Sequence, residues 1–160
     1  MYNIKIIPKE NIDQIIPLLE ILNPKTEKEI LIQRLNDIKE INYQCIGVYD
    51  HTHLIAISGI WILNKIYAGK HIEPDNVVVH PDYRNHGIGE QLLNWIHEYG
   101  RSLGCFTSEL NSRITNENGN RFWKRMGYKV VGYHFIKSLT ADGNHRNAVN
   151  TCLQEDNQNQ

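Results

Sequence analysis

Apolar residues along this chain follow two periods, one typical of helices and one typical of strands. Before Tyr43, two stretches carry apolar side chains three and four positions apart, which is the spacing of one helix face. From Tyr43 onward the apolar residues come in short runs or at every second position, which favours strands. Helical spacing returns after Gly87 and again after Asn116. The pattern therefore predicts two helices, then mostly strands, with two further helices in the second half.

This order predicts an α/β (α+β) fold, a mixed sheet with helices on its faces. The expected strands are Asn3–Ile7, Tyr43–Tyr49, Leu54–Leu63, Ile72–Val79, Cys105–Leu110 and Tyr128–Leu139. The expected helices run from Asn11 to Leu22, from a Thr26-x-x-Glu29 capping box to Ile41, from Gly87 to Leu103 and from Asn116 to Met126. We expect residues 1–139 to form one domain. We expect 140–160 to be a flexible polar tail, with at most one short strand at Ala148–Leu153.

Composition and charge narrow the class of protein. The 160 residues are 41% hydrophobic and 22% charged, with a net charge of −1. This is globular rather than disordered composition, and it lacks the basic excess of a general nucleic-acid binder. We expect no membrane partner, because no apolar run approaches the roughly 20 residues that span a bilayer. Three scattered cysteines and the absence of a signal-peptide layout predict a reducing, cytoplasmic setting.

The stretch Val77–Gly89 carries the strongest chemical signal. A fully apolar run is followed by a glycine-rich turn that opens directly into an amphipathic helix. A helix N-terminus presents unpaired N–H groups and partial positive charge, so it suits a pyrophosphate. Arg84 adds a guanidinium that can bind phosphate oxygens. A tight strand-to-helix turn with no ligand is the alternative interpretation of the same glycines.

Two familiar phosphate-binding loops do not fit this stretch. A dinucleotide fingerprint requires a third glycine where this chain has Leu92. A Walker A loop requires Gly-Lys-Ser/Thr, and here Glu90 follows the last glycine.

The stretch instead resembles the GNAT superfamily of acyl-CoA-dependent N-acyltransferases. Residues 79–84 read Val-His-Pro-Asp-Tyr-Arg, and 84–89 read Arg-Asn-His-Gly-Ile-Gly, as in that family's first motif. The second motif, an asparagine followed later by Phe-Tyr-x-x-x-Gly-Phe, stands as Asn116 and then Phe-Trp-Lys-Arg-Met-Gly-Tyr at 122–128. The order of predicted elements agrees from Asn3 to Leu139. The resemblance implies a mostly antiparallel sheet of about six to seven strands flanked by about four helices.

The resemblance also implies acetyl-CoA as co-substrate and places its binding residues. Backbone N–H groups of the glycine turn would hold the pyrophosphate. The preceding strand would separate from Cys105–Leu110 to hold the pantetheine arm, and an N–H near Val78 would polarise the thioester carbonyl. The implied cofactor-binding residues are Val77, Val78, Val79, Arg84, Asn85, His86, Gly87, Ile88, Gly89, Glu90, Asn116 and Trp123. Asn116 is also a good helix N-cap, and both roles are compatible.

Trp123 departs from the family pattern. Many members have tyrosine there, as the acid that protonates the leaving thiolate, and an indole N–H cannot serve as that acid. Tyr128 and Tyr133 are possible replacements, although packing explains both more simply. A thiol has a pKa of about 8.5, so its thiolate is a fair leaving group without a dedicated acid.

The attacking amine needs to lose a proton, because an alkyl amine with a pKa of about 10.4 is almost fully protonated at pH 7. Family members often use a carboxylate on the strand before the glycine turn. Glu73 is the first candidate here, Asp75 the second and Glu109 the third. Pro74 predicts a bulge or a sheet edge between the first two. A solvated strand end is the alternative for each carboxylate.

We therefore predict an N-acetyltransferase that transfers acetyl from acetyl-CoA to a primary amine of a small molecule or peptide, by direct attack in a ternary complex. The alternative is an acyl-CoA-binding sensor or regulatory module without turnover. A nicotinamide-dinucleotide enzyme is a third interpretation. The eight histidines show no metal-ligand spacing, so we expect no metal. Carboxylates mildly favour a cationic acceptor, a homodimer is possible, and the acceptor itself is not specified by the sequence.

Overall fold

The computed structural model describes residues 2–137 and 139, and the predicted tail with its optional strand lies outside them. The chain divides into two units, Met1–Tyr128 and Lys129–Gln160. The first unit contains a five-stranded sheet in the order β1-β2-β3-β4-β5. Its strands are β1 (Asn3–Ile7), β2 (Tyr43–Asp50), β3 (His53–Lys65), β4 (Gly69–Val79) and β5 (Thr107–Ser108). The first four pair antiparallel, and β4 pairs parallel with β5, so the mixed, mostly antiparallel sheet is confirmed.

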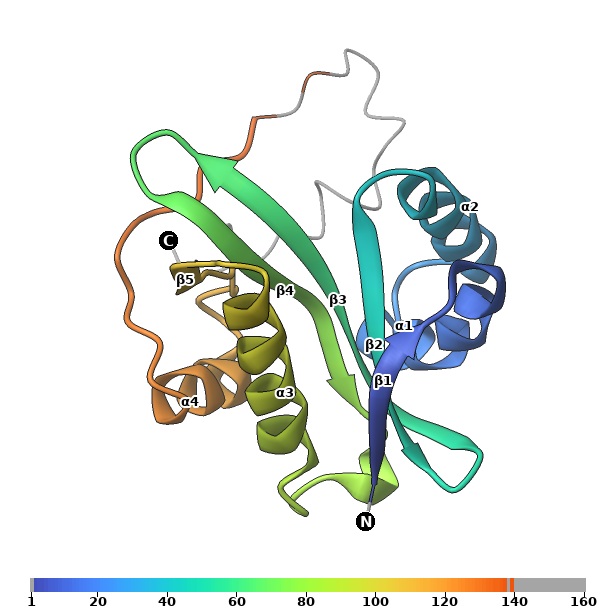
Figure 1. Ribbon diagram of the computed structural model, residues 1–160. Coiled ribbons are helices and arrows are strands. Elements are labelled where there is room, and N and C mark those ends of the chain that lie inside the picture. The colour runs from blue at the N-terminus through green and yellow to red at the C-terminus, as the bar shows by residue number, and fades with distance from the viewer. Residues whose placement is uncertain (1, 138, 140–160) are drawn as a thin grey trace. The chain divides into compact units, whose positions relative to one another are not determined.

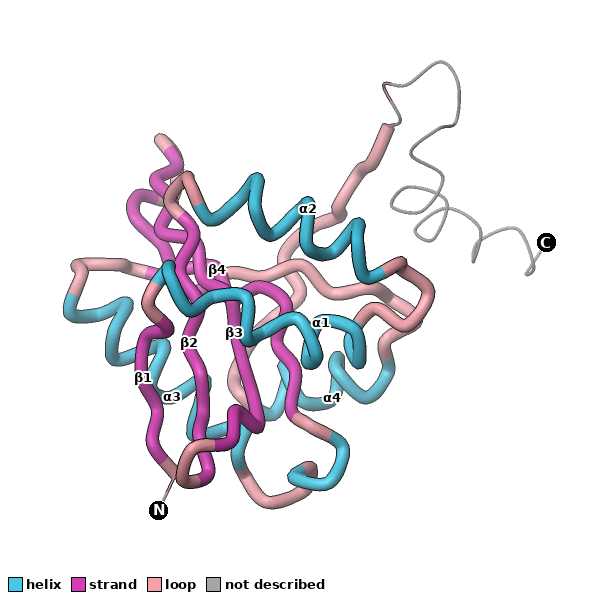
Figure 2. Tube along the Cα trace, turned by 90° about the vertical axis from the view of Figure 1, so that its right-hand side faces the viewer, coloured by secondary structure: helices cyan, strands magenta, loops and turns pink. Residues whose placement is uncertain are grey.

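Four α-helices cover the two faces of this sheet (Figure 1). They are α1 (Ile16–Leu22), α2 (Lys28–Lys39), α3 (Ile88–Ser102) and α4 (Glu117–Arg125). Figure 2 views the sheet from the side on which α1 and α2 lie. One apolar core packs α1 and α2 against the sheet, and a second packs α3 and α4 against the opposite face. No described helix has the length and apolar content needed to cross a bilayer.

Two helix starts differ from the sequence prediction. The first helix is split into a 3-10 helix, Lys9–Ile15, and α1, because Pro17 has no N–H to continue the ladder of i to i−4 hydrogen bonds. The capping box is wrong: Glu27 is the N-cap of α2, and no side chain caps that end.

The strands after α3 are shorter than predicted. The strand expected at Cys105–Leu110 is reduced to β5, which pairs with β4 at only two positions. The strand expected at Tyr128–Leu139 is wrong: the described residues of the second unit form neither strand nor helix. Their apolar side chains, Val130, Val131 and Tyr133 among them, are exposed, so alternating hydrophobicity there is not matched by burial against a sheet. These differences give five strands in the described chain rather than six to seven.

Candidate active site

A cavity of about 450 Å³ lies where β4 ends and where α3 and α4 begin. We call it the β4 cleft. Eleven of the twelve predicted cofactor residues line it, all except His86, which is exposed. The sequence analysis missed the remaining lining residues, which are Leu22, Tyr83, Asn118, Gly119, Phe122 and Arg125. The sequence does indicate that three of these residues share a helix face, because Asn118, Phe122 and Arg125 lie at i, i+4 and i+7 in α4.

A bulge in β4 sets the face of the sheet on which each side chain packs. The register with β3 shifts between the pairs Ile57–Val78 and Gly59–Asp75, so Asn76 and Val77 together oppose one residue of β3. Asn76 has a φ of 49°, the left-handed conformation common in bulges. The extra residue reverses the alternation of side chains. Val78 therefore packs in the core beneath α1 and α2, while Val77 and Val79 pack on the α3 side.

The edge of β4 beside the cleft is open. β4 pairs with β5 only through His71 and Ile72, so among the described residues no strand covers this edge beyond Ile72. His80 donates its N–H to the carbonyl of Ile55 on β3, at 2.8 Å. Successive N–H groups of a strand point to opposite sides, so the N–H of Val79 faces the open edge. The two strands do not pair beyond Ile72 among the described residues, in keeping with the expected separation, and the N–H that faces the open edge is that of Val79.

The glycine turn presents an uncapped helix end to the same cleft. Gly87 is the N-cap of α3 with a φ of 73°, and no side chain caps this end. The first backbone hydrogen bond of the helix runs from the N–H of Gln91 to the carbonyl of Gly87, at 3.0 Å. The three N–H groups before Gln91 have no acceptor among the described residues, so the helix dipole and these donors together favour an anion there.

Two further contacts shape the walls of the β4 cleft. Arg84 donates from Nε to the carbonyl of Val79 at 3.1 Å, which holds the arginine beside the cleft. A Cβ atom on Gly89 would lie 3.2 Å from the ring of Phe122, so a residue without a side chain lets α4 approach the start of α3. The guanidinium of Arg125 lies 5.4 Å from the same ring, on the cleft wall. The cleft therefore carries two arginines near its uncapped helix end.

The second motif forms the opposite wall. The side chain of Asn116 accepts the N–H of Gly119 at 3.1 Å, so its N-cap role is confirmed. Trp123 lines the cleft and packs edge-on against Tyr128, with ring centroids 5.7 Å apart. The hydroxyl of Tyr128 does not reach the cleft. It bonds Ser108 Oγ at 2.6 Å and His97 Nε2 at 2.9 Å, and burial raises its pKa, which keeps it neutral at physiological pH. Tyr133, in the second unit, is exposed.

The three candidate carboxylates occupy different surroundings, and none lines the β4 cleft itself. Asp75 lies next to the bulge and accepts from the side chain of Asn76 at 2.8 Å and from Trp61 Nε1 at 3.4 Å. Glu73 lies two residues earlier and accepts from Asn111 at 3.3 Å. Glu109 forms an ion pair with Lys65, whose hydrogen bond lowers the pKa of Glu109 and makes it a weaker base. Pro74 stands on the open edge, while the bulge lies at Asn76.

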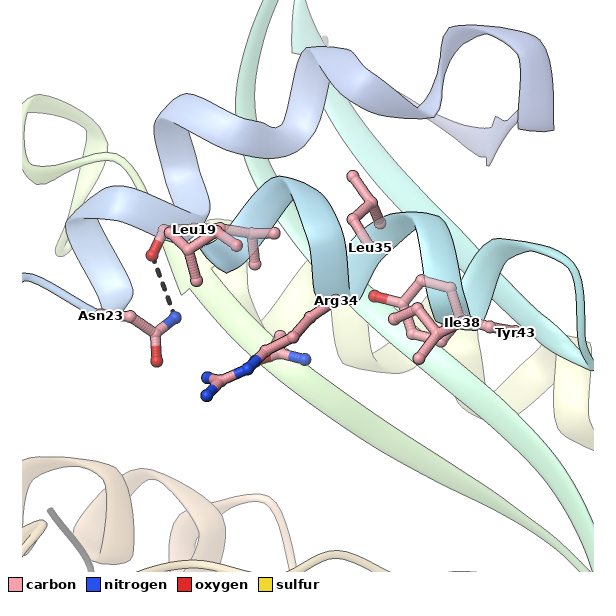
Figure 3. A pocket seen from close by; sticks show the side chains of 8 residues that line it. Leu19, Asn23, Arg34, Leu35, Ile38 and Tyr43 are labelled. Carbon is pink, nitrogen blue, oxygen red and sulfur yellow. Dashed lines mark hydrogen bonds between the residues drawn. The ribbon is translucent and has the colours of Figure 1, made fainter. Parts of the chain in front are cut away.

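A second, smaller cavity of about 110 Å³ lies between α1, α2 and the bulge (Figure 3). We call it the α1–α2 cavity. Its lining residues are Leu19, Asn23, Leu31, Arg34, Leu35, Ile38, Tyr43 and Asn76. The two cavities share no lining residue, although residues adjacent in the chain line them. Leu22 lines the cleft and Asn23 the cavity, and Val77 lines the cleft and Asn76 the cavity. Within the described chain, no three His, Cys, Asp or Glu side chains come together as a metal site would require.

Comparison with known proteins shows the family to which the chain is similar. Residues 13–128 match the family described as Acetyltransferase (GNAT) family. The chain is 25% identical over 133 residues to an uncharacterized N-acetyltransferase of Bacillus subtilis (strain 168), spanning 82% of this chain and 94% of that protein. It is 39% identical over 67 residues to aminoalkylphosphonate N-acetyltransferase of Salmonella typhimurium, spanning 42% of this chain and 44% of that one.

The fold is shared with solved structures. AAC(6′)-Iy, solved in complex with the bisubstrate analogue CoA-S-monomethyl-acetylneamine, superposes with a TM-score of 0.75 at 13% identity, covering 88% of this chain and 99% of that one. The family match spans well over half of the chain. The chain therefore belongs to the acetyltransferase (GNAT) family, and by class it is an acyl-CoA-dependent N-acetyltransferase.

Proposed function

We propose that this enzyme transfers the acetyl group of acetyl-CoA to a primary amine, with the cofactor bound in the β4 cleft. One observation carries the proposal: the open edge of β4 and the uncapped start of α3 line the same cavity. The pyrophosphate would accept from the N–H groups of residues 88–90, with Arg84 and Arg125 as counter-charges. The pantetheine amides would pair with the free backbone of Val77–Val79, as an added strand does.

The thioester would lie at the end of this edge, beside the N–H of Val79. That group is a fixed backbone donor, and it would stabilise negative charge as it develops on the carbonyl oxygen. The carbon–sulfur bond then breaks, and CoA leaves as a thiolate. Trp123 supplies no proton, and Tyr128 is held by Ser108 and His97 outside the cleft. We infer that the thiolate leaves without a tyrosine acid and takes its proton from solvent.

Asp75 becomes the first candidate for the group that accepts the amine proton, and Glu73 the second. Asp75 bonds the side chain of Asn76, which lies in the bulge and lines the α1–α2 cavity, whereas Glu73, two residues earlier, accepts a hydrogen bond from Asn111. A carboxylate there would act directly or through one water. The amine would approach from the α1–α2 cavity, so acetyl donor and acceptor would be held together. We place the reaction in a reducing cytoplasm, in keeping with the free thiols of Cys45 and Cys105.

The test is thermal unfolding with excess acetyl-CoA, with NAD as the control ligand, followed by thiol release from acetyl-CoA with a panel of amines. Ligand at about 100 times its dissociation constant adds about 2.7 kcal/mol, or roughly 5–11 °C for a chain of this size. We expect acetyl-CoA alone to raise the melting temperature and amines to release CoA. Binding without release of CoA would instead support a non-catalytic acyl-CoA-binding module.

Two glycine variants form a matched pair for this test. Gly87 and Gly104 both have positive φ and open space around them. Glutamate at either position is strained by a similar amount. Only Gly87→Glu places a carboxylate at the anion end of the cleft, so only that variant should lose the response to acetyl-CoA. An unchanged response in Gly87→Glu would contradict the proposed cofactor site.

A further inference from the structure

We propose that the α1–α2 cavity binds an acidic group of the acceptor, so that the substrate is a small amine that also carries a carboxylate or a phosphonate. This inference rests on the proposed function, because it concerns the acceptor side of the same reaction. The chemistry required is an anion-binding cation in the cavity and a proton acceptor beside it, within reach of the acetyl donor. The described residues supply the cation in the lining of the cavity and a carboxylate, Asp75, that is bonded to the lining residue Asn76.

Arg34 supplies the cation. It is the only charged side chain that lines the α1–α2 cavity, and it projects from α2 toward Asn23 (Figure 3). Among residues 2–137 and 139 it has no ion pair or hydrogen bond. A planar guanidinium matches carboxylate and phosphonate oxygens with two parallel hydrogen bonds. An arginine left without a carboxylate of its own beside a cavity is therefore suited to a ligand's anion.

Asn23 completes the outer part of the α1–α2 cavity. Its amide nitrogen donates to the carbonyl of Leu19 at 3.0 Å, at the end of α1. That bond fixes the side chain and leaves Oδ1 as an acceptor.

The wall of the cavity at the bulge lies next to the candidate base, Asp75. Asn76 lines the cavity, and its amide bonds the carboxylate of Asp75 at 2.8 Å. The next residue, Val77, lines the β4 cleft. A ligand whose acidic group lies against Arg34 would therefore direct its amine along the bulge, past Asp75, to the thioester. The step itself is unchanged: a nitrogen–carbon bond forms, the carbon–sulfur bond breaks, and the amine proton passes to a base.

The size of the α1–α2 cavity limits this ligand. At about 110 Å³ it has room for a few water-sized groups, each about 30 Å³ in liquid water. An acidic group with one or two methylenes fills that space. Apolar side chains, Leu31, Leu35 and Ile38 among them, line the rest of the wall and suit the methylenes.

The test compares amines with and without the acid at matched length. Glycine and aminomethylphosphonate are paired with ethylamine, and β-alanine and 2-aminoethylphosphonate with propylamine. The two arms separate carboxylate from phosphonate. At saturating acetyl-CoA we expect acid-bearing amines to have kcat/KM roughly 10- to 100-fold above their neutral partners, as a charge-assisted hydrogen bond allows, with the difference mostly in KM. Equal use of both kinds of amine would overturn the inference.

Variants of Arg34 assign the preference to this residue. Arg34→Gln should lower kcat/KM for acid-bearing amines to that of their neutral partners while the acetyl-CoA thermal shift is retained, and Arg34→Lys should keep part of the preference. Arg101→Gln is the control, since Arg101 is exposed on α3 and lines neither cavity. A preference that persists in Arg34→Gln would overturn the assignment.

The same measurements separate the two proposals. No response to acetyl-CoA and no CoA release with any amine would refute the proposed function. A response to acetyl-CoA with CoA release from neutral amines only would refute the acidic acceptor alone. Acid-bearing amines that neither react nor stabilise the CoA-loaded protein would also refute it.

Discussion

The position of single side chains decides which carboxylate can serve the reaction. Asp75 and Glu73 are both on β4, two residues apart, on the side of α1 and α2. Asp75 bonds the side chain of Asn76, which lines the α1–α2 cavity, while Glu73 is bonded to Asn111. In the proposed reaction, this placement would give Asp75 rather than Glu73 access to the amine.

We therefore predict that Asp75→Asn lowers kcat about 100-fold, the lower end of what a general base contributes, and that Glu73→Gln leaves kcat close to wild type. The loss in Asp75→Asn should shrink as pH rises toward 10, because the free-amine fraction grows about tenfold per pH unit below the amine pKa of about 10.4. The measurement is CoA release from pH 6.5 to 9.5. Normal acetyl-CoA thermal shifts in both variants serve as the folding control, and equal losses in the two would contradict this assignment.

Among individual residues, the sequence predicted the lining of the β4 cleft better than the lining of the α1–α2 cavity. Residues 77–89 are continuous in the chain, so local chemistry alone showed a strand that ends at an uncapped helix. The α1–α2 cavity joins Asn23 and Arg34 to Asn76, and such distant residues come together only through sheet register and helix packing. Arg125 was not predicted from the sequence, because its place on the cleft wall depends on how α4 packs.

At the scale of elements, the β4 bulge determines which face each residue occupies. Pro74 predicted an edge or a bulge, and the structure has the edge there and the bulge two residues later, at Asn76. Sequence alone did not locate it, because asparagine is common in turns and caps as well as in bulges. The short β5 was also unpredictable in length, since the apolar run at Cys105–Leu110 does not show where pairing with β4 ends.

The backbone conformation at the bulge leads to a prediction about the free energy of unfolding. Asn76 has a φ of 49°, a conformation that asparagine tolerates and β-branched residues do not. Asn76→Val should lower the free energy of unfolding by about 1–2 kcal/mol relative to Asn76→Gly, which adopts this φ without strain. Both variants lose the hydrogen bond to Asp75, so the difference isolates the backbone. Urea unfolding measures it, and equal stability of the two would show that the bulge relaxes without cost.

At the scale of the whole enzyme, the presence of two separate cavities favours one kinetic mechanism. In the proposed reaction, acetyl donor and acceptor would occupy separate spaces at the same time, so the transfer needs no acetyl group held covalently by the protein. A covalent route would need a nucleophile at the cleft. Burial raises the pKa of the Cys45 thiol to about 12, and neither Cys45 nor Cys105 lines either cavity. Thiolate, the reactive form, is scarce for such a thiol at neutral pH.

We accordingly predict sequential kinetics. Initial rates measured against acetyl-CoA at several fixed amine concentrations should give double-reciprocal lines that intersect, because both substrates must be bound before either product leaves. Parallel lines, or exchange of acetyl between acetyl-CoA and labelled CoA without amine, would instead indicate an acetyl-enzyme intermediate. Cys105→Ser supplies the check for an overlooked thiol: it should leave the rate and the line pattern unchanged. If exchange occurred in the wild type and disappeared in this variant, direct attack across the two cavities would be wrong.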